Sequence, residues 1–230
     1  MVNPITLNPV NKAPFILGSV IFSLLVLSHL AWGEVDVPLF GTMESFHWDI
    51  LSRVRLPRVL AAVAGGAGLS LCGLVLQTWF GNPLAGPSVL GISSGAGLGV
   101  ALLILMGVSG GWWATASAAM VGSVLVLLAV LFVAHRFKTA ASLLIFGLML
   151  NYVIGALITV LQAEARQEAL QQFVFWGMGT FGHGSFGSSL ALAALVLVVF
   201  IALWRMRRSL DLWTLGSLTA RSMGVNDVAL

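Results

Sequence analysis

Residues 53–99 read RVRLPRVLAAVAGGAGLSLCGLVLQTWFGNPLAGPSVLGISSGAGLG, and this stretch decides the fold. It opens with three arginines within six residues and continues into two apolar segments rich in glycine, alanine and serine. A short turn with two prolines, Asn82 to Ser88, separates the two segments. Neither a water-soluble core nor a simple membrane anchor needs an arginine cluster beside such segments.

The composition of the whole chain indicates its class. Of 230 residues, 59% are hydrophobic and only 8% are charged, and the mean hydropathy is +1.02. Polar surface cannot cover such a chain in water, so we expect an integral membrane protein. The formal net charge of +3 is too small for a nucleic-acid-binding face, and no nucleic-acid partner is expected. Cys72 lies in an apolar run and is interpreted as a membrane-buried hydrophobe.

Continuous apolar runs of about 17 to 25 residues predict membrane-spanning helices. The first run has no small-x-small cleavage site, so we expect it to be retained rather than removed as a signal peptide. We predict an all-α, polytopic helical bundle over residues 1–208 with about six transmembrane helices. The predicted helices lie near residues 14–32, 57–80, 88–108, 112–134, 141–163 and 189–204.

The distribution of lysine and arginine predicts the orientation in the membrane. A cytoplasmic N-terminus places seven of the eleven basic residues on the cytoplasmic side: Lys12, Arg136, Lys138, Arg205, Arg207, Arg208 and Arg221. Six of the eight acidic residues then lie outside, together with Arg166 and the cluster Arg53, Arg55 and Arg58. Because this cluster runs against the positive-inside tendency, it needs an explanation.

Two interpretations of the arginine cluster stay open from charge placement alone. In the first, the side chains reach lipid headgroups or pair with Glu44 and Asp49 nearby. In the second, they bind an acidic partner outside the membrane. Guanidinium groups suit that task because they hold carboxylates bidentately and keep their charge when partly desolvated.

Small residues recur at helical spacing on both sides of the turn. They are Ala62, Gly66 and Ser70 before it and Gly91, Gly95 and Gly99 after it. Such faces let helix backbones approach closely, so they predict tight helix packing, with a subunit interface or a smooth pore wall as the alternative. The turn itself is predicted to be rigid and non-helical, with Asn82 capping backbone groups beside Pro83.

The opening stretch resembles the permease subunits of ABC importers for iron-siderophores, haem and vitamin B12, which have the type II importer fold. The matching pieces are Arg55-Leu-Pro-Arg58, Gly65-Gly-Ala-Gly68 to Gln77, Asn82-Pro-Leu-Ala85 and Leu90-Gly-Ile-Ser-Ser-Gly-Ala96. Weaker agreement continues at Phe146-Gly147, Phe175-Trp176-Gly177, Leu215-Gly216 and Ala220-Arg-Ser-Met-Gly224.

The resemblance implies partners as well as site residues. It matches Arg55 and Arg58 to arginines that receive acidic residues of a periplasmic or lipoprotein substrate-binding protein. It matches residues 209–230 to the start of a cytoplasmic region that meets an ATP-binding subunit. The coupling residues would be Leu215, Gly216, Ala220, Arg221 and Gly224. It also implies a second permease copy, the bacterial inner membrane, and a translocation path near residues 151–180.

The chain departs from the family pattern at several points. Gly81 stands where a charged residue commonly precedes Asn-Pro-Leu-Ala, and Ser217 stands where an acid commonly follows Leu-Gly. Family permeases also have about ten helices of spanning length, and a second half that this sequence does not match. We therefore expect the chain to be the N-terminal part of a permease, with the C-terminal half of the family fold absent.

No catalytic constellation is found in the sequence. It has no Gly-x-x-x-x-Gly-Lys-Ser/Thr loop, so any ATP hydrolysis is expected from a partner. The histidines have no metal-binding spacing, and we expect neither a metal nor a cofactor, although His183 stays open as a contact to a haem or iron chelate. We predict a permease subunit that moves an iron chelate, haem or a cobalamin by alternating access. The alternatives are a secondary transporter and a non-transporting scaffold.

Overall fold

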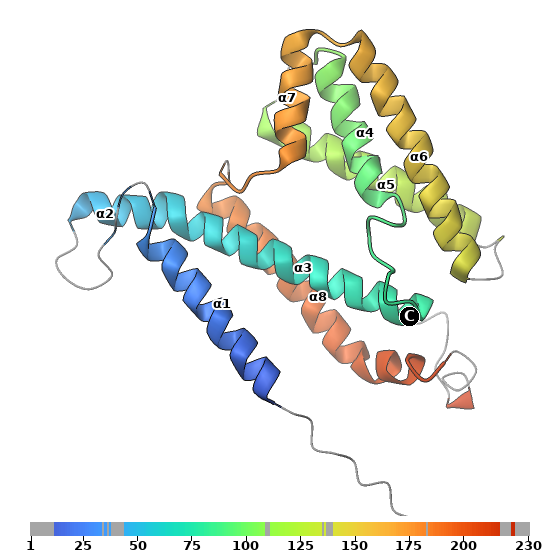
Figure 1. The fold of residues 1–230 in the computed structure, drawn as a ribbon, viewed down its shortest axis with the longest axis horizontal. Coiled ribbons are helices and arrows are strands. Elements are labelled where there is room, and N and C mark those ends of the chain that lie inside the picture. Colours follow the sequence, from blue (N-terminus) through green and yellow to red (C-terminus); the bar gives the residue numbers. More distant parts are fainter. Residues whose placement is uncertain are drawn as a thin grey trace, which may run out of the picture. The chain divides into compact units, whose positions relative to one another are not determined.

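The computed structural model describes residues 12–33, 35, 37, 44–108, 111–134, 136, 140–182, 184–216 and 222–223. Within these residues every regular element is helical, which confirms the predicted all-α class. The elements are α1 (Ala13–Ala31), α2 (Ser45–Ile50), the π-helix η1 (Leu51–Arg55), α3 (Leu56–Phe80), α4 (Ile92–Leu105), α5 (Trp112–Ala134), α6 (Ala140–Glu164), α7 (Gln167–Met178) and α8 (Phe186–Trp213) (Figure 1).

Five helical stretches in the described part are long and apolar enough to cross a bilayer. They are Ala13–Ala31, Ser45–Phe80, Trp112–Ala134, Ala141–Glu164 and Phe186–Trp213, and they match five of the six predicted runs. Many large apolar side chains on them are exposed, and α1 buries no residue at all. Such exposure fits helices whose outer faces lie against lipid chains rather than water.

The third predicted run, 88–108, contains a much shorter helix than expected. Only the 14 residues of α4 are α-helical there, and a rise of 1.5 Å per residue makes α4 about 21 Å long, against about 30 Å of hydrocarbon. The residues before it form turns, and Gly91 has a φ of +79°, a left-handed conformation that ends the turn and starts the helix. The apolar turn residues made the predicted run too long.

The chain divides into two compact units. One comprises Met1–Ala64 and Phe181–Ala193, and the other comprises Gly65–Thr180 and Ala194–Leu230. In the first unit, the π-helix η1 packs against both α1 and α2. In the second unit, α4 is the central element and packs against α5, α6 and α7 (Figure 1).

The core of the second unit forms around α4. Val100 and Ala101 have no exposed surface, and they share a cluster with Phe173 of α7. A second cluster joins the turn before α4 to α5 and α6 through Leu90, Val126, Val130 and Ile154. Helix α7, which the apolar runs did not predict, thus packs on the central helix.

Glycine allows the backbones of neighbouring helices to touch in this core. A Cβ atom on Gly95 of α4 would lie 2.6 Å from the carbonyl oxygen of Gly122 in α5, and one on Gly99 would collide with the carbonyl oxygen of Ala118. A Cβ on Gly147 of α6 would lie 2.7 Å from the carbonyl oxygen of Val89. Gly66 of α3 differs, because a Cβ there would meet no described atom within 4 Å beyond its own stretch of helix.

We predict that Gly95→Ala destabilises the protein, because the added methyl group forces α4 and α5 apart. Overpacking of this kind costs about 1–3 kcal/mol, so the midpoint of thermal unfolding in detergent should fall by several degrees. Gly66→Ala is the matched control, and it should leave the midpoint unchanged or raise it slightly, since alanine favours a helix over glycine. Equal midpoints for the two variants would contradict the packing described for α4 and α5.

Candidate functional site

The arginine cluster lies on a continuous helical stretch that changes its winding. Residues 45–80 run from α2 through η1 into α3 without a break. Pro57 has no N–H to donate, so the carbonyl of Arg53 lacks its usual α-helical partner. Just before it, the N–H of Leu56 bonds the carbonyl of Leu51, five residues back, which is the bond of a π-helix. The widened turn ends at Arg55, and such π turns often occur at functional sites.

The three arginines of the cluster have different surroundings. Arg53 is exposed, and its Nε lies 3.1 Å from Oδ1 of Asp49, one of the two kinds of contact that the first interpretation allowed. The two side chains are 80% and 63% exposed, so this ion pair contributes little to stability. Arg58 is exposed, and within the described residues it has no ion pair.

Arg55 is only 7% exposed, and two backbone carbonyls accept hydrogen bonds from its guanidinium. Nη1 donates a hydrogen bond of 2.6 Å to the carbonyl oxygen of Leu30, and Nη2 donates to the carbonyl oxygen of Val35. Leu30 belongs to the last turn of α1, where carbonyls have no partner within the helix. Arg55, which lies just before α3, therefore supplies a hydrogen-bond donor to a backbone carbonyl at the end of α1.

The turn between α3 and α4 is stabilised by backbone and side-chain hydrogen bonds. Gly81 has a φ of +57° just after α3, and the N–H of Asn82 donates to the carbonyl oxygen of Gln77 at 3.2 Å, which closes the helix end. Oδ1 of Asn82 accepts the N–H of Leu84 at 2.9 Å, and Pro83 occupies the turn between them. The side chain of Asn82 thus caps a backbone group, as its position in the sequence suggested.

The end of α8 packs against the end of α3. The rings of Trp79 and Trp213 stack with centroids 5.1 Å apart, and Nε1 of Trp213 donates to the carbonyl oxygen of Trp79 at 3.4 Å. A pocket of about 510 Å³ lies here, lined by Leu74, Gln77, Thr78, Trp79, Phe80, Gly81, Asn82, Pro83, Trp213, Thr214 and Gly216. The stack therefore holds the segment that leads toward the predicted coupling residues.

The predicted coupling residues are only partly described. Leu215 is 61% exposed, and Gly216 has a φ of +100° directly after it. Ala220, Arg221 and Gly224 lie outside the described residues. His183, kept open as a contact to a haem or iron chelate, also lies outside them.

Polar side chains join α4 to its neighbours at a depth where apolar residues dominate. Oγ of Ser94 donates to Oδ1 of Asn151 in α6, and Oγ of Ser123 in α5 donates to the carbonyl oxygen of Ile92 at 3.3 Å. Hydrogen bonds between membrane helices contribute about 0.6–2 kcal/mol each. Asn151 begins the region 151–180 expected near the translocation path, and it is a polar residue inside a long apolar helix.

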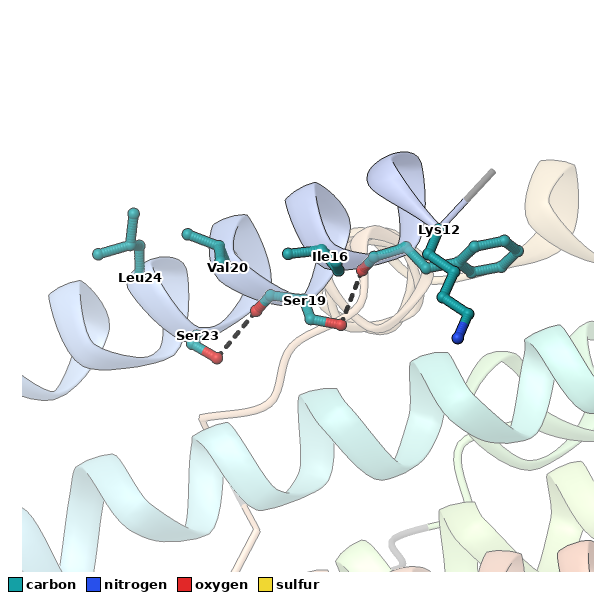
Figure 2. A pocket seen from close by; sticks show the side chains of 7 residues that line it. Lys12, Ile16, Ser19, Val20, Ser23 and Leu24 are labelled. Carbon is teal, nitrogen blue, oxygen red and sulfur yellow. Dashed lines mark hydrogen bonds between the residues drawn. The ribbon is translucent and has the colours of Figure 1, made fainter. Parts of the chain in front are cut away.

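A shallow groove of about 570 Å³ follows one face of α1 (Figure 2). Its lining is Lys12, Phe15, Ile16, Ser19, Val20, Ser23 and Leu24. The hydroxyls of Ser19 and Ser23 donate to carbonyl oxygens one turn earlier in the same helix, at 2.9 and 2.8 Å. Their polarity is thereby satisfied within α1, and the groove presents an apolar surface with a lysine at one end.

The sequence did not predict the contacts that hold these sites. The carbonyls of Leu30 and Val35 carry no side-chain signal, and Trp213 lies 134 residues from Trp79. Two residues did carry a usable signal in the sequence. They are Pro57, two positions after Arg55, and Asn151, inside a long apolar helix. Within the described residues, no group of three or more histidine, cysteine, aspartate or glutamate side chains is placed to hold a metal ion.

These features define a polytopic, all-helical membrane protein. The fold matches a solved structure described as an inward-facing conformation of a metal-chelate type ABC transporter, with a TM-score of 0.81 and 28% sequence identity, over 94% of this chain and 69% of that one. A family model described as the FecCD transport family matches residues 15–229, and the chain belongs to that family.

Curated relatives agree with the family assignment. The chain is 38% identical over 219 residues to the hemin transport system permease protein HmuU of Yersinia pestis, which covers 89% of this chain and 66% of the relative. It is 34% identical over 215 residues to the vitamin B12 import system permease protein BtuC of Shigella boydii, which covers 90% and 64%. The chain thus spans about two thirds of the length of these relatives.

We predict that Trp213→Leu loosens the end of α8, because it removes both the stack on Trp79 and the hydrogen bond to its carbonyl. Aromatic pairs contribute about 0.5–1.5 kcal/mol, so backbone amides at residues 213–216 should exchange about two- to tenfold faster in hydrogen-exchange mass spectrometry. Trp204→Leu is the control, since Trp204 contacts Phe200 and Arg207 within α8 itself. Equal exchange at residues 213–216 in both variants would refute the role of the stack.

Proposed function

We propose that this chain forms the membrane-spanning permease of an ABC importer for haem, a cobalamin or another metal chelate. The observation that carries the proposal is the family match over residues 15–229, joined to the similarity with a haem and a vitamin B12 permease. Substrate crosses the membrane unchanged by alternating access, and a partner ATPase supplies the energy. Family membership favours this function over a secondary transporter or a non-transporting scaffold.

The proposed partners follow from the same family membership. The permease pairs with a second permease copy in the bacterial inner membrane, with its N-terminus in the cytoplasm. A substrate-binding protein docks from outside, and an ATP-binding subunit contacts the segment that begins at Leu215 and Gly216. The exposed position of Leu215 supports this contact, because an apolar side chain on the surface suits a protein interface.

Docking of the binding protein is proposed at the arginine cluster. Of the two arginines matched to the family's docking residues, Arg58 is the exposed one. It can approach a partner carboxylate without giving up an ion pair made by the described part of the chain. Arg58 is therefore the residue through which we place the charge contact.

The proposed function is tested by transport into vesicles. The permease is purified from its native membrane with its bound subunits and reconstituted, and uptake of haem, a ferric siderophore and cobalamin is measured with ATP inside or outside the vesicles. ATP-dependent uptake of one of these substrates is expected. Substrate uptake driven by an ion gradient alone, with no ATP dependence, would overturn the proposal.

We predict that Arg58→Glu weakens association with the substrate-binding protein by about tenfold or more, because it replaces attraction by repulsion at a docking contact. The salt dependence of association should also become shallower, since one charge contact is lost. Both effects are measured by titrating the binding protein onto the permease in nanodiscs. Arg53→Glu makes the same change of charge at an arginine paired with Asp49, and it should have a smaller effect; equal losses would contradict a specific contact at Arg58.

A further inference from the structure

We propose that Arg55 is a positioning residue that clamps the chain leaving α1, and that it holds the outer surface on which Arg58 docks the partner. The clamped segment consists of the described residues that follow α1, namely Trp32, Gly33, Val35 and Val37, here called the α1 exit residues. Only its link to docking rests on the proposed function. The clamp itself rests on the geometry of this one unit of the fold.

The clamp joins one guanidinium to two backbone carbonyls. The guanidinium of Arg55 donates to Leu30, inside the last turn of α1, and to Val35, beyond its end. One side chain thus binds the helix and the chain that leaves it. Arginine suits this task because its planar guanidinium presents several N–H donors in a fixed fork, and the carbonyl end of a helix attracts positive charge.

Val37 lies back against the end of α1. The N–H of Val37 donates to the carbonyl oxygen of Ala31 at 3.1 Å, and the side chain of Val37 is only 3% exposed. The N–H of Trp32 donates to the carbonyl oxygen of Ser28 at 2.8 Å. The helical bonding of α1 thus continues to Trp32, Val37 is folded back on the end of the helix, and the Arg55 guanidinium bridges Leu30 and Val35 within this bend.

Gly33 lies directly beside the Arg55 guanidinium. A Cβ atom at this position would lie 2.8 Å from Nη2 of Arg55 and 3.4 Å from Cζ. Glycine thus leaves the space in which the guanidinium reaches the carbonyl of Val35. A methyl group there displaces the guanidinium without removing its charge.

Arg55 and Arg58 differ in how easily a carboxylate from outside could reach them. A carboxylate from outside would have to enter a site where Arg55 is 7% exposed and displace two carbonyl oxygens. Such displacement leaves polar groups desolvated and without partners. Arg58 is exposed and requires neither step. The structure assigns the clamp to Arg55 and the charge contact to Arg58.

The test of the clamp uses Val37→Cys as a reporter in a C72A background, labelled with a membrane-impermeant maleimide. Val37 is buried in the clamped state, so labelling should be slow in the parent and at least about tenfold faster in Arg55→Gln, which loses two hydrogen bonds from a charged donor. Gly33→Ala should speed labelling in the same direction while keeping the charge. Arg53→Gln, the control for loss of charge, should label like the parent.

The test of positioning measures association with the binding protein at several salt concentrations. Arg55→Gln should weaken association by a similar factor at every salt concentration, and Gly33→Ala should do the same. Arg58→Gln should instead make the salt dependence shallower, because its charge faces the partner. This difference in salt dependence separates a residue that holds the surface from one that touches the partner.

Each result decides the inference. Unchanged labelling of Val37→Cys in both Arg55→Gln and Gly33→Ala would overturn the clamp. If Arg55→Gln does not fold, Gly33→Ala alone decides, since it retains every charged side chain. A salt dependence flattened by Arg55→Gln as strongly as by Arg58→Gln would overturn the division of tasks. If the parent protein does not associate with the substrate-binding protein but Val37→Cys is labelled as expected, the proposed function is refuted and the clamp is still supported.

Discussion

Backbone carbonyl groups have no water to bond inside a bilayer, and the arrangement of this chain depends on how those groups are satisfied. Helices bond most of them internally but leave the last four carbonyls of each helix without a partner. At two helix ends a long side chain from elsewhere supplies a donor: Arg55 bonds Leu30 in α1, and Trp213 bonds Trp79 in α3. The first bond lies at the arginine cluster, and the second holds the end of α8, which leads to Leu215.

The same constraint explains why α4 is enclosed. A helix of about 21 Å leaves its flanking turns at membrane depth, where irregular backbone is tolerated only if protein surrounds it. Helices α5, α6 and α7 surround α4, and the turn before it is buried at Ala85 and Leu90, which are 3% and 5% exposed. Glycines at the contacts let the backbones approach closely enough to exclude lipid.

The length and hydropathy of an apolar run can be read directly from the sequence. This is why five of the spanning helices were predictable. The ends of α4 were not, because the turn residues beside Gly91 are as apolar as the helix, and backbone conformation decides where it starts. Helix α7 was missed because its polar residues broke the apolar run. Side-chain partners were also beyond prediction, since Leu30 and Val35 lie 25 and 20 residues from Arg55 and offer only backbone oxygens.

Arg55 and Arg58 show how far one motif can determine the task of its residues. They are three positions apart, a spacing that in a helix places side chains near each other. The widened turn that ends at Arg55 precedes Pro57, and after it one arginine is buried and the other is exposed. Their spacing in the sequence gives no reason to distinguish the two arginines. The cost of removing water from an approaching carboxylate, however, differs between them. A carboxylate reaching Arg55 must lose its water and break two bonds, and at Arg58 it keeps most of its hydration until contact is made.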